Sequence, residues 1–220
     1  MKGGRRMKKK VIVSIAFNTF GFTEERFTKK WIDYRMKLFM NYTAQSLKAQ
    51  TNQNFLTLVR YADETKPLID EALSKYEKLP ANIQFTGKEY HLIVKEAIKD
   101  VDYLYLVRID SDDMYHKTYI EQMHRYRHKE DTEVLINQNG YLYDTRTNAI
   151  APISYESPQF YTLIYKASDY LNGKRYTLPG GHSGAIKLKH EIIKKRNFLN
   201  IIHEHNTLPK NIINKDTIVS

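Results

Sequence analysis

The residues Tyr103-Leu-Tyr-Leu-Val-Arg-Ile109, which run directly into Asp110-Ser-Asp-Asp113, decide the fold class of this chain. The first seven are rich in aromatic and β-branched types and are bounded by polar residues, a pattern that predicts a buried strand. In an α/β sheet, ligands bind outside the carboxyl ends of the strands. We therefore expect the three carboxylates after this strand to hold a cation at the edge of a sheet.

The spacing and chemistry of the carboxylates indicate which cation they would bind. Asp110 and Asp112 are two residues apart, so one can face an ion while the other reaches it across the turn, directly or through water. Oxygen ligands of this kind suit Mg²⁺ or Mn²⁺, which usually share a phosphate with a substrate. A structural alternative is that residues 111–113 open the next helix, where acidic side chains stabilise the N-terminus. This alternative applies more to Asp113 than to Asp110.

Apolar strands alternate with amphipathic helices over about the first 130 residues, which predicts an α/β domain. The expected strands cover residues 11–17, 54–63, 83–85 and 103–109. The expected helices begin at Thr23, at Thr65 with Pro67 in the first turn, and at Tyr90. Polar or acidic residues follow the strands, so half of a nucleotide site is expected at this edge of a parallel sheet.

The second half of the chain has a different pattern. Short strands are expected at residues 133–138, 141–144 and 149–153, with turns at Asn139-Gly140 and Thr147-Asn148. The glycines of Pro179-Gly-Gly-His-Ser-Gly184 would let the backbone approach a ligand and would expose His182 and Ser183, although a plain turn is the alternative. Near the end, His203 or His205 could complete an oxygen-rich Mn²⁺ shell or serve in packing.

Composition limits the classes of protein that fit. A chain of 220 residues with 41% hydrophobic content fits one large domain with a sizeable core. The absence of cysteine excludes thiolate metal sites, disulfides and cysteine nucleophiles, and it agrees with a cytoplasmic location. Residues 11–17 are too few to cross a bilayer and lack a small-residue cleavage site, so they predict a first strand rather than a signal peptide.

The net charge of +10 is unevenly distributed. Residues 1–10 are expected to form a flexible basic tail, which contains Lys2, Arg5, Arg6, Lys8, Lys9 and Lys10. Such a tail is either simply solvated or makes weak contact with an anionic membrane surface or nucleic acid. The remaining chain is only modestly basic, which suits a phosphorylated donor and argues against a dedicated nucleic-acid groove.

Several elements, taken in order, resemble a known family. They are a first strand ending near Asn18, the passage Gln45-Ser-Leu-Lys-Ala-Gln50-Thr-Asn-Gln-Asn-Phe55 before a strand that ends in Asp63, the motif Arg108-Ile-Asp-Ser-Asp-Asp113, and Ile202-His-Glu-His-Asn206. Over about residues 11–206 the chain is similar to GT-A fold glycosyltransferases, most of all to the bacterial rhamnosyltransferase-like group.

The resemblance implies an α/β fold of the GT-A nucleotide-diphospho-sugar transferase type, with a mixed, mostly parallel central sheet flanked by helices. It implies a single domain over residues 11–220. The nucleotide-binding half would extend to about residue 130, and the acceptor half would begin at about residue 131.

The resemblance also implies a function. The chain would be a metal-dependent hexosyltransferase, of the rhamnosyltransferase kind, that moves a sugar from a nucleotide-diphosphate sugar to an envelope glycan, a polymer or a protein. Mn²⁺ or Mg²⁺ would neutralise charge on the leaving diphosphate. The implied metal ligands are Asp110, Asp112, Asp113 and His203. The implied donor-binding residues are Asn18 and Asp63 near the nucleoside, and Arg108, Asp110, Ser111 and Asp112 near the diphosphate.

Two points stay open in the sequence. Arg108 could pair with a phosphate or with one of the neighbouring carboxylates. An inverting transferase needs a base at the acceptor hydroxyl, whereas a retaining one can act without it. The candidates are His182, Asp144 and Glu156, and His182 is favoured because the glycines expose it.

Two other classes of function fit parts of the sequence. A nucleotidyltransferase of the same fold would carry a glycine-rich basic loop after its first strand, which Asn18-Thr-Phe-Gly-Phe22 does not supply. A non-catalytic module could use the basic tail and the 17 tyrosines to bind nucleic acid or carbohydrate. Tyr103 and Tyr105 alternate along the expected strand, however, which core packing explains better.

Overall fold

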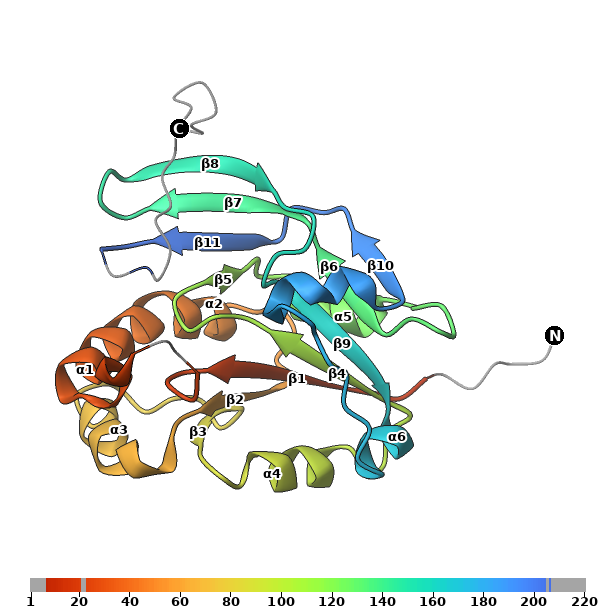
Figure 1. Ribbon diagram of the computed structural model, residues 1–220, viewed down its shortest axis with the longest axis horizontal. Helices are drawn as coiled ribbons and strands as arrows, with labels where there is room; N and C mark the ends of the chain where they lie inside the picture. Colours follow the sequence, from red (N-terminus) through yellow and green to blue (C-terminus); the bar gives the residue numbers. More distant parts are fainter. Residues whose placement is uncertain (1–6, 21–22, 205, 207–220) are drawn as a thin grey trace.

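Two β-sheets and the helices packed on them make up the molecule, as Figure 1 shows for the computed structural model. The structure describes residues 7–20, 23–204 and 206. Lys2, Arg5 and Arg6 of the expected basic tail, and His205, lie outside the described residues. In the described part of the chain, no helix combines the length and the apolar character needed to cross a membrane.

The central sheet has seven strands in the order β10-β6-β9-β4-β1-β2-β3. Their bounds are β1 (Lys9–Ala16), β2 (Leu56–Arg60), β3 (Ile83–Thr86), β4 (Tyr103–Arg108), β6 (Val134–Asn137), β9 (Tyr161–Lys166) and β10 (His190–Ile193). Among these strands β9 alone runs antiparallel to its neighbours, β4 and β6. The prediction of a mixed, mostly parallel sheet is therefore confirmed, and strands from both halves of the chain build it.

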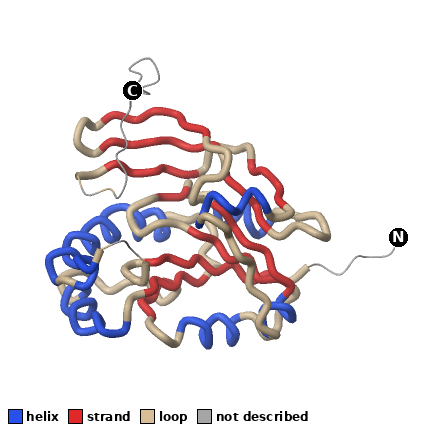
Figure 2. Tube along the Cα trace, viewed as in Figure 1, coloured by secondary structure: helices blue, strands red, loops and turns tan. Residues whose placement is uncertain are grey.

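Helices cover both faces of this sheet (Figure 2). Their bounds are α1 (Lys29–Leu38), the π-helix η2 (Phe39–Thr43), α2 (Ala44–Lys48), α3 (Lys66–Leu73), α4 (Tyr90–Ala97), α5 (Tyr119–Arg125) and α6 (Ala167–Leu171). Along β1, Val11 and Val13 face the core under α1, α2, α3 and α5, whereas Ile12 packs with α4 and α6 on the other face. Burial on both faces explains why these strands are continuous apolar runs rather than alternating ones.

The second sheet has four strands in the order β5-β11-β7-β8. Their bounds are β5 (Met114–Tyr115), β7 (Asn139–Asp144), β8 (Ala149–Ser154) and β11 (Phe198–Ile202). The turn expected at Thr147-Asn148 is confirmed, since β7 and β8 pair as a hairpin and Asn148 has a φ of 55°. Figure 1 shows this sheet above the carboxyl ends of the central strands.

The turn expected at Asn139-Gly140 is wrong, because both residues lie in β7 and the preceding strand β6 belongs to the other sheet. The glycine serves packing instead. A Cβ at Gly140 would lie 2.3 Å from the ring of Phe198 in the neighbouring β11. Only glycine therefore allows this ring to lie directly against the strand.

Two element boundaries near the N-terminus differ from the prediction. Residues Glu24–Phe27 form a 3-10 helix, η1, and α1 starts only after Thr28, whose side chain accepts a hydrogen bond from the backbone N–H of Trp31. Capping by Thr28 rather than Thr23 fixes the start of the long helix. Strand β1 begins at Lys9, whose ammonium donates to the carbonyl of Tyr126 just after α5, so part of the expected tail is strand.

Candidate active site

The carboxyl ends of β1, β2, β3 and β4 meet at one edge of the central sheet because these four strands are parallel. The acidic loop, residues 110–113, follows β4 at this edge. Asn18 follows β1, and Asp63 lies in the short helix η3 (Asp63–Thr65) after β2. The predicted donor-binding residues therefore do gather at one edge, although β2 ends at Arg60, earlier than expected.

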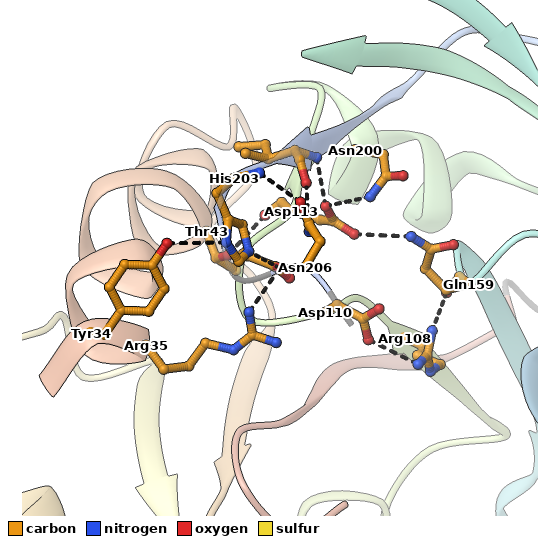
Figure 3. A network of polar contacts seen from close by, with 12 residues as sticks. Tyr34, Arg35, Thr43, Arg108, Asp110, Asp113, Gln159, Asn200, His203 and Asn206 are labelled. Atoms are coloured by element: carbon orange, nitrogen blue, oxygen red, sulfur yellow. Dashed lines mark hydrogen bonds and ion pairs between the residues drawn. The ribbon is translucent and has the colours of Figure 1, made fainter. Parts of the chain in front are cut away.

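Three segments that are distant in sequence meet at Asp112, and Figure 3 shows the side chains of Tyr34, Arg35 and His203 that gather there. Its Oδ2 atom lies 2.8 Å from Nη1 of Arg35 on α1 and 2.9 Å from Nε2 of His203, which follows β11. The hydroxyl of Tyr34 lies 3.1 Å from the other ring nitrogen, Nδ1, of His203. Both Asp112 and His203 are buried. The structure thus brings together two of the four predicted metal ligands, which are 91 residues apart in sequence.

Asp113 is held by a different kind of partner. Its Oδ1 accepts hydrogen bonds from the side-chain amide of Asn200 at 2.8 Å and from the backbone N–H of Ile201 at 2.9 Å, and its Oδ2 accepts one from Gln159 at 3.2 Å. Its backbone carbonyl accepts a hydrogen bond from the hydroxyl of Thr43 in η2. The contacts with Asn200 and Ile201 join the acidic loop to β11 of the second sheet. The alternative that residues 111–113 open a helix is wrong, since α5 begins only at Tyr119.

Asp110 is the most open of the three carboxylates. Its side chain is 35% exposed, and its Oδ1 lies 2.8 Å from Nη2 of Arg108. Arg108 also donates to the backbone carbonyl of Gln159 at 2.9 Å and lies over the ring of Tyr161. In this structure Arg108 therefore pairs with a neighbouring carboxylate, one of the two roles that the sequence allowed.

Two buried polar atoms beside the acidic loop have no hydrogen-bond partner among the described residues. They are Oγ of Ser111 and Nε of Arg35. Such atoms are uncommon in folded proteins, and a bound water, ion or ligand is one explanation for them. The donor types of Asp110, Asp112 and His203 fit Mn²⁺ or Mg²⁺, and Ser111 adds a hydroxyl. In their present positions, however, no three described His, Asp or Glu side chains form a group that could hold a metal ion.

A cavity of about 280 Å³ lies at the ends of β2 and β3, beside the first residues of α4. Arg60 and Lys88 outnumber Asp63 among its charged lining residues, so the net charge is positive, and His91 also lines the cavity. Burial, followed by the charges of Arg175 and Arg60, lowers the pKa of His91. A basic cavity of this size at the carboxyl edge of a parallel sheet suits part of a nucleotide.

Asp63 and Asn18 have structural contacts at this cavity. The Oδ1 of Asp63 accepts a hydrogen bond from the backbone N–H of Lys88 at 2.9 Å, and a Cβ at Gly87 would lie 1.9 Å from the same oxygen. The amide of Asn18 is buried, with its nitrogen 3.0 Å from Thr65 Oγ1 and its oxygen accepting from the backbone of Ala62. Asp63 therefore lines the cavity while fixing its wall, and Asn18 supports the wall from behind.

The three candidate bases lie on separate elements. Asp144 ends β7, and its carboxylate forms a two-pronged ion pair with Arg146, which holds the pKa of the carboxyl below its usual range. Glu156 is exposed in the loop after β8. His182 is exposed in the 3-10 helix η4 (Gly181–Lys187), which follows Gly180 in the left-handed region. A carboxylate held as Asp144 is held is a weak base at neutral pH.

The loop before β9 links His182 to the acidic loop. The hydroxyl of Ser157 donates to the backbone carbonyl of His182 at 3.3 Å, and Gln159, two residues later, donates to Asp113. The glycine-rich segment thus packs on a loop that itself contacts the candidate metal site.

Several residues of the site were not predicted from the sequence: Tyr34, Arg35, Thr43, Gln159 and Asn200. Nothing in the sequence pattern relates α1 to the acidic loop, and Tyr34 was indistinguishable from the apolar positions of its helix. Asn206 belongs to a motif that was recognised without a role. Its Oδ1 accepts a hydrogen bond from the backbone N–H of His203 at 2.6 Å, so it fixes the turn that carries this imidazole.

Residues 22–161, more than half of the chain, match the family described as "Putative rhamnosyl transferase". The chain belongs to this family, and the resemblance inferred from its motifs is confirmed. No curated protein sequence matches the chain.

Solved structures give more distant similarities. S. aureus TarS 1-349 in complex with UDP-GlcNAc is 15% identical, with a TM-score of 0.47 over 91% of this chain and 60% of that one. A cytidylyltransferase from Leptospira borgpetersenii serovar Hardjo-bovis is 14% identical, with a TM-score of 0.42 over 87% of this chain and 77% of that one. The chain spans about 60% of the length of the TarS 1-349 structure.

Proposed function

We propose that this protein is a hexosyltransferase of the rhamnosyltransferase kind, which transfers a sugar from a nucleotide-diphosphate sugar and depends on Mn²⁺ or Mg²⁺. Family membership supports the transferase class. One observation carries the assignment of the site: the 2.9 Å contact between Asp112, after β4, and His203, after β11, at the carboxyl edge of the sheet. A buried carboxylate and imidazole that meet across 91 residues beside a second, more open carboxylate are a donor set for a divalent ion.

The donor would lie along this edge. We assign the nucleoside to the basic cavity lined by Asp63, Arg60 and Lys88, and the diphosphate to the space between that cavity and the acidic loop. Asn18 would affect nucleoside binding indirectly, because its hydrogen bonds hold the cavity wall in place. This arrangement follows the rule that ligands of parallel sheets lie across the strand ends.

Asp110, Asp112 and His203 would hold the divalent ion, with Ser111 as a nearby hydroxyl. Asp113 would become a further ligand of the ion only if its carboxylate gave up the three hydrogen bonds that it now accepts. When bound, the ion supplies positive charge where negative charge develops on the leaving diphosphate. Arg108 can contribute to the same stabilisation because its guanidinium lies beside Asp110.

For the acceptor side, we favour His182 as the base. Its exposure in η4 and the contact of that segment with the loop at 157–159 support this choice over Asp144, whose carboxylate is occupied by Arg146, and over Glu156. The proposed acceptors are an envelope glycan, a polymer or a protein. A cytoplasmic location, with weak contact to the inner membrane face through the basic N-terminal residues, is supported by the cysteine-free sequence and its net charge.

Thermal unfolding with a panel of nucleoside diphosphates, each with and without Mn²⁺, tests the proposal. We expect stabilisation only when both are present, because a ligand that binds the folded state at about 100 times its Kd adds about 2.7 kcal/mol of stability. The matched control is Asp112→Asn, which should lose the response. If no diphosphate stabilises the protein with or without metal, the assignment is wrong. Mass spectrometry of nucleotide-sugar hydrolysis then identifies the donor.

A further inference from the structure

We propose that Arg35 is a resident cation, which occupies Asp112 in this structure and moves to the donor diphosphate when the divalent ion binds. This inference rests on the proposed function. It assigns a role to a helix residue that lies 77 positions from Asp112 in the sequence. It also predicts that Arg35 has opposite effects on the binding of metal and of nucleotide.

Arg35 and a divalent ion would compete for one oxygen atom of Asp112. Nη1 of Arg35 lies 2.8 Å from Oδ2 of Asp112, and Nε2 of His203 lies 2.9 Å from the same oxygen. A divalent ion held jointly by this carboxylate and this imidazole would take the position between them. A guanidinium that remained there would repel the ion at short range. Arg35 therefore has to leave Asp112 before the ion can bind fully.

The contact between Arg35 and Asp112 is of a kind that can be released. A single nitrogen of Arg35 pairs with Asp112, and Nε of Arg35 is buried without a hydrogen-bond partner among the described residues. The pair between Arg146 and Asp144 is different, since Nε and Nη2 of Arg146 contact the two carboxylate oxygens at 2.9 and 2.7 Å. Two nitrogens of Arg146 thus contact two carboxylate oxygens, which is the stronger arrangement, whereas only one nitrogen of Arg35 contacts Asp112.

Contacts other than those of Arg35 hold the surrounding structure in place. Tyr34 contacts Nδ1 of His203, and Thr43 donates to the backbone carbonyl of Asp113. Both contacts come from the same helical segment, which includes the π-helix η2, and π-helices are frequent at functional sites. They would keep the imidazole and the acidic loop in place while the guanidinium moves.

The destination follows from the chemistry of the guanidinium. Its planar set of donors matches the oxygens of a phosphate, and a bound diphosphate would supply the acceptor that Nε lacks. The Arg35 side chain is 19% exposed, so it reaches the surface of the site. Trp31, one turn earlier on α1, offers a flat ring 5.6 Å from the guanidinium, against which the side chain can rest in either position.

The test is calorimetric titration of the full chain with Mn²⁺ alone and with UDP or dTDP in the presence of saturating Mn²⁺. For Arg35→Gln we expect Mn²⁺ alone to bind about tenfold more tightly than in the unsubstituted protein, and the nucleotide to bind about tenfold more weakly. Each change corresponds to about 1.4 kcal/mol. Arg35→Lys keeps the charge but not the planar fork, so it should leave Mn²⁺ binding nearly unchanged and weaken nucleotide binding.

Lys29→Gln is the matched control, because it removes one positive charge from the same helix at an exposed side chain that pairs with Glu71 and Asp33. It should change neither affinity. The displacement is wrong, while the proposed function stands, if Arg35→Gln binds Mn²⁺ no more tightly than the unsubstituted protein. It is also wrong if Lys29→Gln tightens Mn²⁺ binding as much as Arg35→Gln does. If the unsubstituted protein binds neither Mn²⁺ nor either nucleotide, the proposed function fails and this inference fails with it.

Discussion

Asp112 and Asp113 are adjacent in sequence and both buried, yet they face two different parts of the molecule. Asp112 faces α1 and the end of β11, where its partners are the guanidinium of Arg35 and the imidazole of His203. Asp113 faces the second sheet, where it accepts hydrogen bonds from neutral amide groups. One short loop therefore has a charged side and a neutral side.

The difference separates binding from scaffolding. Two side-chain amides and one backbone N–H together hold the Asp113 carboxylate in a single geometry. A charged partner on a long side chain, such as Arg35, can exchange with an incoming cation at little net cost, since the carboxylate keeps a positive neighbour throughout. The charged side of the loop is suited to bind a ligand, and the neutral side is suited to keep the loop in place.

The largest effect should come from the charged side. Asp112→Asn keeps the shape of the side chain but removes its charge, so sugar transfer should fall by on the order of 10³-fold, comparable to the loss of a main electrostatic group in an active site. Initial rates with the donor found in the hydrolysis screen measure it. The melting temperature should change little, and turnover within threefold of the unsubstituted protein would mean that this side of the loop does not hold the ion.

The neutral side should show its effect in stability. Asp113→Ala removes three hydrogen bonds and leaves the donors of Asn200, Ile201 and Gln159 buried without an acceptor. We expect the free energy of unfolding to fall by about 3 kcal/mol or more, measured by urea titration. The same substitution at Asp112 should cost clearly less stability. Equal losses at the two positions would remove the distinction between the two sides.

Tyr34 tests how the charged side is organised. Tyr34→Phe removes the hydroxyl beside Nδ1 of His203 and leaves the ring in place. We expect the affinity for Mn²⁺ to fall by about tenfold, as it does when an outer partner of a metal-binding histidine is lost. Circular dichroism should show an unchanged fold. Tyr42→Phe, a half-buried tyrosine farther along the same helical segment, is the control and should bind Mn²⁺ normally.

The sequence predicted this site in part, because some of its determinants are local. The apolar run of β4 and the carboxylates after it are neighbours in the chain, and a parallel sheet puts such residues at its carboxyl edge whatever the rest of the molecule does. His203 could be assigned only through the resemblance to a family, since its contact with Asp112 spans 91 residues. Arg35 was not predicted at all, because an arginine on an amphipathic helix usually lies in solvent.

Contacts distant in sequence also explain the errors in the fold. The dipeptide Asn139-Gly140 has the composition of a hairpin turn, but the ring of Phe198 from β11 determines that a glycine is needed inside the strand. Thr23 and Thr28 are equally good caps by type. The backbone conformation of η1 decides between them, and residue type does not reveal that conformation.

The smallest expected effect concerns a third carboxylate, Asp144, which is buried like Asp112 and is paired with Arg146 through both of its oxygens. The ion pair with Arg146 lowers the pKa of Asp144, so the folded protein binds a proton there less readily than the unfolded chain. The stabilisation is complete above the ordinary carboxyl value of 3.8 and is lost as the pH falls through the lower folded-state pKa. Because Arg146 is partly exposed, we expect less than about 1 kcal/mol, measured as the difference between the unsubstituted protein and Asp144→Asn in urea titrations from pH 6 to pH 3. A large loss of sugar transfer in Asp144→Asn at neutral pH would instead assign this carboxylate to the chemistry, and the locked ion pair would then have to open during the reaction.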